Sequence, residues 1–98
     1  MKVYDKASWQ IDNGMDTDIV LNHFNFMFNW LNENGFLNGE GKELLDIGID
    51  ESISINERLL SEKGIKFMDV YYDELIAESN YDTTIEVDLL KAKLKENC

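Results

Sequence analysis

The sequence contains no proline and only one cysteine, Cys98. A single cysteine excludes a disulfide within the chain, so nothing in the sequence indicates an oxidising compartment. Residues 1–6 lack the apolar segment of a signal peptide, and no run approaches the roughly eighteen apolar residues of a membrane span. These absences predict a cytoplasmic protein, and the lack of proline suits a helical chain with few sharp loops.

Basic residues are also scarce. Nine Lys and Arg stand against twenty Asp and Glu, which gives a formal net charge of −11 over 98 residues. Nucleic acid and anionic membrane surfaces are disfavoured as partners, because both require a basic protein surface. A basic protein partner, or simple solubility, is compatible with this charge. The length predicts a single domain, 1–98, and a hydrophobic content of 44% is typical of a globular chain.

The most regular stretch runs from Asp16 to Gly35 and predicts a central helix. A narrow polar stripe recurs at helical spacing within it, and nearly all other positions are apolar, so neighbours should cover the helix on more than one side. Asp16 is the expected N-cap, and Gly35 is the expected left-handed residue after the C-terminus. We interpret the stripe as a solvated face rather than a recognition surface. It consists of Asp18, Asn22, Asn25, Asn29 and Asn32.

His23 is the only histidine, and it lies inside the apolar arc of this helix. One interpretation is a buried histidine that titrates or binds a ligand. We favour the other interpretation, a core histidine with one satisfied hydrogen bond, because no acid or second histidine lies close enough in the sequence to build a site.

The flanking segments are less regular. Residues 1–15 show no helical period, so we expect an extended arm anchored by Trp9, with an edge strand as the alternative. Residues 42–47 predict a short helix with Leu44, Leu45 and Ile47 turned inward. A buried connection is the expectation for residues 49–55, with a short strand as the alternative.

Two stretches match the capping box, in which a Ser or Thr and a Glu three positions later bond to the first turn of a helix. Residues 54–57 predict a long helix that ends near Ser79, with a kink or a break at Gly64. Residues 83–86 predict a last helix that ends near Glu96. The expected fold class is therefore all-α, a compact bundle of about four helices with an extended N-terminal arm.

The segment from Asp69 to Asp88 contains seven acids and no Lys or Arg. Acids four residues apart on a helix repel one another, so a chain selected only for stability would include Lys among them. One interpretation is a protein-binding surface for a basic partner, with Tyr81 as an apolar anchor. The other is an acidic solvated face whose tyrosines pack inward. The candidate partner-binding residues are Asp69, Asp73, Glu74, Glu78, Tyr81 and Asp82.

Motifs for catalysis and for metal binding are missing from the sequence. There is no nucleophile near the histidine, no Gly-rich phosphate loop and no zincin motif. An EF-hand that began at Asp12 would need Gly at the position of Thr17 and Glu at the position of His23. We therefore expect no enzyme activity, no catalytic residues, no cofactor and no metal site.

The stretch Tyr4-Asp5-Lys6-Ala7-Ser8-Trp9, followed by Ile11-Asp12 and Gly14, resembles the head of a group of small, acidic, uncharacterised bacterial proteins. Residues 48–51 and 71–73 resemble further parts of that pattern, whereas Gln10 stands where the group has a histidine. The group is similar in size and charge to the immunity proteins of bacterial toxin systems. The resemblance covers about a third of the chain, and it implies function by analogy only.

The leading hypothesis is a cytoplasmic protein-binding inhibitor of the immunity-protein kind. Its acidic face would occupy the basic cleft of a partner such as a toxin, and complementary charge would speed their association. The alternative hypothesis is a small homodimeric structural or regulatory domain without catalytic activity.

Overall fold

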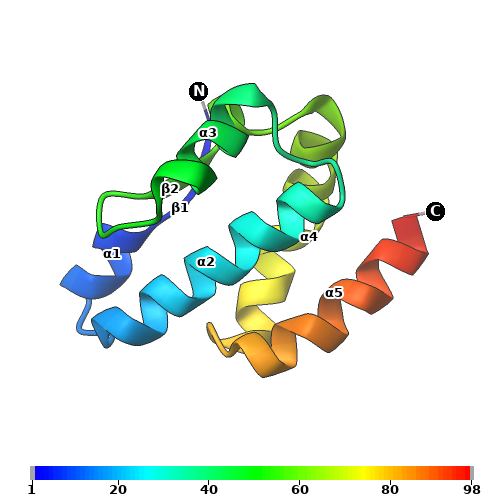
Figure 1. Cartoon of the computed structure of the whole chain (residues 1–98). Helices are drawn as coiled ribbons and strands as arrows, with labels where there is room; N and C mark the ends of the chain where they lie inside the picture. The colour runs from blue at the N-terminus through cyan, green and yellow to red at the C-terminus, as the bar shows by residue number, and fades with distance from the viewer. Residues whose placement is uncertain (1, 98) are drawn as a thin grey trace.

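Helix α2 (Thr17–Glu33) crosses the centre of the molecule in the computed structural model, which describes residues 2–97 (Figure 1). The Asp16 carboxylate caps its first turn by accepting a hydrogen bond from the backbone N–H of Asp18 at 2.9 Å. The chain leaves the helix through Gly35, whose φ of 73° is left-handed. Both ends confirm the predicted central helix, because local residues decide where a helix starts and stops.

One side of α2 supplies much of the hydrophobic core. The polar stripe on the other side is exposed, which confirms the prediction of a solvated face. Burying each large apolar side chain contributes about 1.5–3 kcal/mol, so this helix provides a large part of the free energy of folding. The fully buried apolar side chains of α2 are Val20, Phe24, Met27, Phe28 and Leu31.

The N-terminal residues form a paired strand instead of an unpaired arm. Strand β1 (Val3–Lys6) pairs antiparallel with β2 (Ser54–Asn56), and Asp5 lies opposite Ile55. An edge strand in residues 1–15 and a short strand near residues 49–55 were the alternatives to an extended arm and a buried connection, and both strands are present. The prediction of a pure all-α bundle is wrong. Each strand is too short to show a period of two, and its partner lies in a distant part of the sequence, so no local pattern marks the pairing.

Helix α1 (Ala7–Asp12) continues directly from β1. Ala7 is buried, and its backbone N–H donates to the carbonyl oxygen of Ile53 at 3.1 Å. Trp9 is 47% exposed, so the expectation that it anchors an arm is wrong. Because Ala7 faces the core on this short helix, the side chain two positions later points outward.

Helix α3 (Gly39–Ile47) contains the helix predicted over 42–47 and begins three residues earlier. Leu44 and Leu45 are half-buried against the core, as predicted. Ile47 is 76% exposed, which contradicts the prediction. It is the last residue of the helix, and the chain turns away at once through a left-handed glycine with a φ of 118°.

The first predicted capping box does not start a helix. Its first three residues form β2, and Glu57 begins a single 3₁₀ turn, η1 (Glu57–Leu59), which Asn56 caps. Helix α4 (Glu62–Ser79) begins later, where the Ser61 hydroxyl accepts a hydrogen bond from the N–H of Gly64 at 3.2 Å. Pairing with β1 therefore overrides the local capping signal.

Helix α4 continues through Gly64, so the predicted break at this position is absent. A Cβ atom at this position would collide with the carbonyl oxygen of Phe36, so the glycine lets α4 lie directly against the segment that follows α2. The backbone N–H of Ser61 donates to the same carbonyl oxygen at 2.9 Å. Close packing, rather than helix flexibility, explains the glycine.

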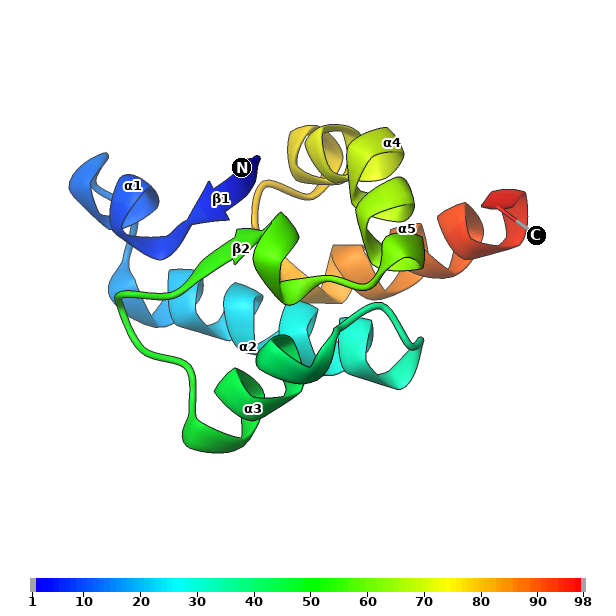
Figure 2. The ribbon, with the colours of Figure 1, turned by 90° about the horizontal axis from the view of Figure 1, so that it is seen from above.

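Helix α5 (Thr83–Asn97) confirms the predicted last helix to within one residue at its C-terminus. Figure 2 shows its C-terminal end extending beyond the rest of the molecule. The prediction that residues 83–86 form a capping box is wrong. Asp82 caps the helix, and the side chain of Glu86 is fully buried instead of bonding to the first turn. The buried residues of α5 are Glu86, Leu90 and Lys93, and Leu89 and Leu94 are half-buried against the core.

The described residues thus form a mostly helical molecule of five α-helices with one small two-stranded sheet. The predicted helical character is confirmed, and the count of about four helices without a sheet is wrong. No helix within residues 2–97 is both long enough and apolar enough to cross a membrane.

Candidate functional site

The four acids of α4 predicted to bind a partner are all exposed, but they do not form one patch. Asp69 and Asp73 lie about one turn apart on one flank of the helix, and Glu74 and Glu78 lie about one turn apart on the other. Val70, which is 65% exposed, lies between the two flanks. A single flat partner surface would therefore meet one pair more closely than the other.

The first flank is tied to the N-terminal strand. Lys2 Nζ lies 3.0 Å from Asp69, and the Tyr4 hydroxyl donates to the same carboxylate oxygen at 2.6 Å. The hydrogen bond from Tyr4, followed by that from Lys2, lowers the pKa of Asp69 below its ordinary value. Asp69 is thus already partnered within the chain, and it has less charge to offer to another molecule.

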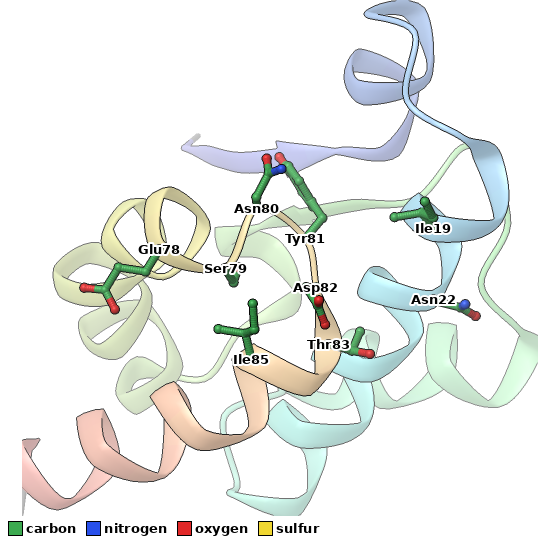
Figure 3. A pocket seen from close by; sticks show the side chains of 9 residues that line it. All are labelled: Ile19, Asn22, Glu78, Ser79, Asn80, Tyr81, Asp82, Thr83 and Ile85. Carbon is green, nitrogen blue, oxygen red and sulfur yellow. The ribbon is translucent and has the colours of Figure 1, made fainter.

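The second flank leads to a pocket of about 550 Å³ beside the turn between α4 and α5, which we call the turn pocket (Figure 3). Glu78 and Asp82 line it together with Ile19 of α2 and Ile85 of α5, which are 49% and 43% exposed. Figure 3 shows Asp82 between the two isoleucines and Glu78 pointing outward at the rim. None of the described residues that line the pocket is Lys or Arg.

Asp82 has a second role as the cap of α5. Its carboxylate accepts hydrogen bonds from the backbone N–H of Thr84 at 2.9 Å and from the Thr84 hydroxyl at 2.6 Å. The hydroxyl bond is the main reason that the pKa of Asp82 lies below its ordinary value. The fold of the turn therefore holds one negative charge at the turn pocket.

Tyr81 does not offer an exposed ring to a partner, which corrects the prediction of a surface anchor. Its side chain is buried, and its hydroxyl donates to Asp5 of β1 at 2.8 Å. Figure 3 shows the side chain extending towards β1. The φ of Tyr81 is 66°, a left-handed value that is uncommon for a residue with a Cβ atom. Tyr81 forms part of the inner wall of the turn pocket and ties the turn to the sheet.

Behind this wall, polar side chains form one connected row, which we call the buried cluster. Tyr72 and Tyr81 donate to the same oxygen of Asp5, at 2.7 and 2.8 Å. The other oxygen of Asp5 accepts from Gln10 Nε2 at 3.0 Å. Asp5 therefore joins β1 and α1 to α4 and to the turn. The members of the buried cluster are Asp5, His23, Tyr72, Ser79, Tyr81 and Glu86.

His23 connects the two halves of the buried cluster. Its Nε2 lies 2.9 Å from the Tyr72 hydroxyl, and its Nδ1 lies 2.8 Å from the Glu86 carboxylate. The Ser79 hydroxyl donates to Glu86 at 3.0 Å. Both ring nitrogens are therefore used, which corrects the expectation of a histidine with one hydrogen bond.

The hydrogen bonds indicate how the protons are shared. Tyr72 donates its only proton to Asp5, so in this arrangement His23 Nε2 is the donor of its bond to Tyr72. His23 Nδ1 and Glu86 share the next bond of the row. Within residues 2–95, every buried side-chain nitrogen and oxygen has a partner.

The two buried tyrosines are held in their neutral form. Burial is the largest cause that raises the pKa of Tyr72 far above its ordinary value, and the neighbouring Asp5 adds to it. Burial and the hydrogen bond to Asp5 likewise raise the pKa of Tyr81. Both hydroxyls therefore remain donors across the ordinary pH range, which keeps the cluster intact.

The geometry of the cluster favours a structural role over chemistry. Ser79 gives its proton to Glu86 and not to the histidine, so the arrangement differs from a Ser–His–acid triad. Its groups are also buried and bonded to one another rather than directed at a cavity. Among the side chains that the structure describes, in residues 2–95, no group of three or more His, Cys, Asp or Glu is placed to hold a metal ion.

The partner of His23 was missed because it lies 63 positions away in the sequence. One signal was available: a histidine in an apolar arc needs partners for both nitrogens, since an unpaired buried polar group is costly. That signal predicts buried polar partners without saying which residues they are. The isoleucines of the turn pocket were missed as well, because they lie on two different helices.

No protein-family model, no curated protein and no solved structure matches the chain.

Proposed function

We propose that the protein is a noncatalytic inhibitor that binds a basic protein partner, in the manner of an immunity protein that neutralises a toxin. One observation carries the proposal: the turn pocket combines the carboxylates of Glu78 and Asp82 with the exposed side chains of Ile19 and Ile85. Lys and Arg side chains have an apolar stem and a charged end, so such a pocket fits a basic side chain.

The charge of the whole chain supports the same proposal. Twenty acids against nine basic residues produce a negative field that attracts a basic partner from a distance and speeds the encounter. Asp73 and Glu74 extend the acidic surface beyond the pocket, whereas Asp69 is partly neutralised by Lys2. A nuclease toxin of the cytoplasm, whose cleft binds phosphate groups, would have the required positive charge.

The proposal is tested by neutralising acids at the pocket. The variant Glu78→Gln, Asp82→Asn removes both charges there, and Asn at position 82 retains the ability to cap α5. A matched control, Glu33→Gln, Asp46→Asn, removes two exposed charges elsewhere. The wild-type chain and both variants are immobilised and exposed to a lysate of the source organism, and bound protein is eluted with a salt gradient.

We expect the wild-type chain and the control to retain one basic protein in stoichiometric amount, which leaves as the salt concentration rises because exposed charges are screened within about 8 Å at physiological salt. The pocket variant should retain much less. Equal retention by both variants, or no basic protein on the wild-type chain, would rule out the turn pocket as the binding site.

A further inference from the structure

The turn between α4 and α5 is strained. Asn80 and Tyr81 have φ values of 50° and 66°, and they are the only residues other than glycine within 2–97 with positive φ. The left-handed conformation is unfavourable for residues with a Cβ atom, and two such residues in succession are unusual. We call residues 79–82 the hinge. Its conformation must be stabilised by contacts elsewhere.

One specific contact holds the hinge closed. Tyr81 donates to the Asp5 oxygen that also accepts from Tyr72. These tyrosines are nine residues apart, which is about two and a half helical turns, so on one continuous helix they would point in opposite directions. Both reach Asp5 only because α4 ends at Ser79. The bond from Tyr81 therefore exists only in the bent form of the hinge.

Helix α5 is attached to the body by a mixture of apolar and charged side chains. Leu90 is its only fully buried apolar side chain in the described residues, Leu89 and Leu94 are half-buried against the core, and Leu90 lies between two buried charged residues. Glu86 is held by His23, and Lys93 Nζ lies 3.4 Å from Glu74. These are directional contacts to groups on α2 and α4, and the α5 of another copy could make them equally well.

We propose that α5 exchanges between two copies of this chain. In the exchanged dimer the hinge is helical, α4 and α5 form one continuous helix, and each α5 occupies the site beside α2 and α4 of the other copy. The hinge contains neither Gly nor Pro, so its residues can enter a helix, and doing so removes two left-handed residues per chain. The contacts of Glu86 and Lys93 are kept, and the bond from Tyr81 to Asp5 is lost.

The occupant is a second copy because the site is already complementary to α5. Strain in a short hinge is a recognised driving force for such exchange. Each chain carries a net charge of −11, so repulsion opposes the dimer and added salt favours it. A straight hinge also removes the turn pocket, which is built from the bent form.

The test compares two substitutions in the hinge with opposite expected effects. Tyr81→Phe removes the hydrogen bond to Asp5. Only the bent form makes this bond, so the two separate chains lose two bonds in total, whereas the dimer that they form loses none. Because each bond is to a charged group, the dimer dissociation constant should fall about 100-fold or more. Asn80→Gly favours the bent form, since glycine adopts left-handed φ freely and disfavours a helix, so the dimer should weaken about tenfold.

The mass of each chain is measured by sedimentation over a range of protein and salt concentrations, and circular dichroism verifies folding. In a dimer of unlabelled and isotope-labelled chains, filtered nuclear Overhauser spectra should show His23 of one chain close to Glu86 of the other. A chain lacking Asn80, whose hinge is too short to bend back, should form the dimer at all concentrations.

The proposal is overturned if Tyr81→Phe folds and stays monomeric at high protein and salt concentration. A dimer whose His23 and Glu86 contact one another only within one chain also overturns it. If both Tyr81→Phe and the chain lacking Asn80 fail to fold, the straight hinge is incompatible with the fold, and the proposal is again wrong.

Discussion

Helices α2 and α5 are attached to the same molecule by different forces. The core-facing side of α2 is almost wholly apolar, and His23 is its single buried polar residue. The core-facing side of α5 is mixed: Leu90 is buried between the charged residues Glu86 and Lys93, and Leu89 and Leu94 are half-buried against the core. The first attachment depends on the apolar area removed from water, which is non-directional. The second depends in addition on hydrogen bonds and an ion pair that need particular partners.

This difference shows why the two helices respond differently to change. Apolar burial tolerates small movements, because neighbouring side chains fill much of a gap. A buried carboxylate that loses its partner retains the full cost of its desolvation. Helix α5 should therefore detach when a single polar partner is removed, whereas α2 should be lost only when the whole fold is lost.

The largest effect is expected from placing a charge in the apolar side of α2. Phe28→Asp removes a fully buried ring and buries a carboxylate, which should cost at least about 4 kcal/mol and leave the chain largely unfolded. Asn32→Ala on the exposed stripe is the matched control and should change stability by less than about 0.5 kcal/mol. Urea denaturation followed by circular dichroism measures both. A folded Phe28→Asp chain would show that α2 is not the centre of the core.

The next effect concerns the polar attachment of α5. Glu86→Ala leaves His23 Nδ1 and the Ser79 hydroxyl without a partner and should destabilise the protein by about 3–5 kcal/mol. His23→Leu combined with Glu86→Leu should cost less than the sum of the single substitutions, with a coupling of at least about 1 kcal/mol. Additive costs in this double-mutant cycle would contradict a directional attachment.

A smaller effect is expected at alkaline pH. Burial and Asp5 raise the pKa values of Tyr72 and Tyr81, so the folded chain holds more protons than the unfolded chain above about pH 10. This contribution to stability is complete below pH 10 and is lost as the pH rises further. Tyrosinate absorbance should appear together with unfolding. Tyr81→Phe should make the alkaline loss of stability less steep, and an unchanged slope would argue against the bond to Asp5.

The smallest effect lies on the exposed surface. Tyr4 and Lys2 lower the pKa of Asp69, so its contribution to stability is present above the ordinary pKa of about 4 and is lost as the pH falls through the lowered value. Tyr4→Phe should raise the pKa of Asp69 towards its ordinary value in an NMR titration of the side-chain carboxyl carbon. High salt should weaken the effect of Lys2. No change in Tyr4→Phe would exclude the hydrogen bond.

Local sequence signals were reliable wherever a local interaction decides the structure. Asp16 and Gly35 marked the ends of α2, and the spacing of its asparagines marked the exposed face. The same kind of signal failed at residues 54–57, where a capping box is used as a strand. A capping box indicates that a helix can start, and pairing with a distant strand can still be more favourable.

Local sequence signals predicted the acidic surface, whereas they did not predict the turn pocket. Exposure of Asp73 and Glu74 follows from helical spacing and charge. The convergence of Ile19 with Ile85, and the burial of Tyr81, follow from how α2, α5 and β1 meet. Helical spacing places a side chain on a face of its own helix, and it does not say what lies opposite that face.

By itself, the sequence determined a mostly helical chain, the position and exposed stripe of α2, and a strongly acidic surface, because composition and periods of a few residues encode these properties. The tertiary structure alone decided that β1 pairs with β2, that His23 lies between Tyr72 and Glu86, and that buried charged groups help to attach α5. Those contacts join residues as much as 63 positions apart. Their partners are chosen by the packing of the whole chain, where a buried polar group must find its hydrogen bonds wherever the fold places them.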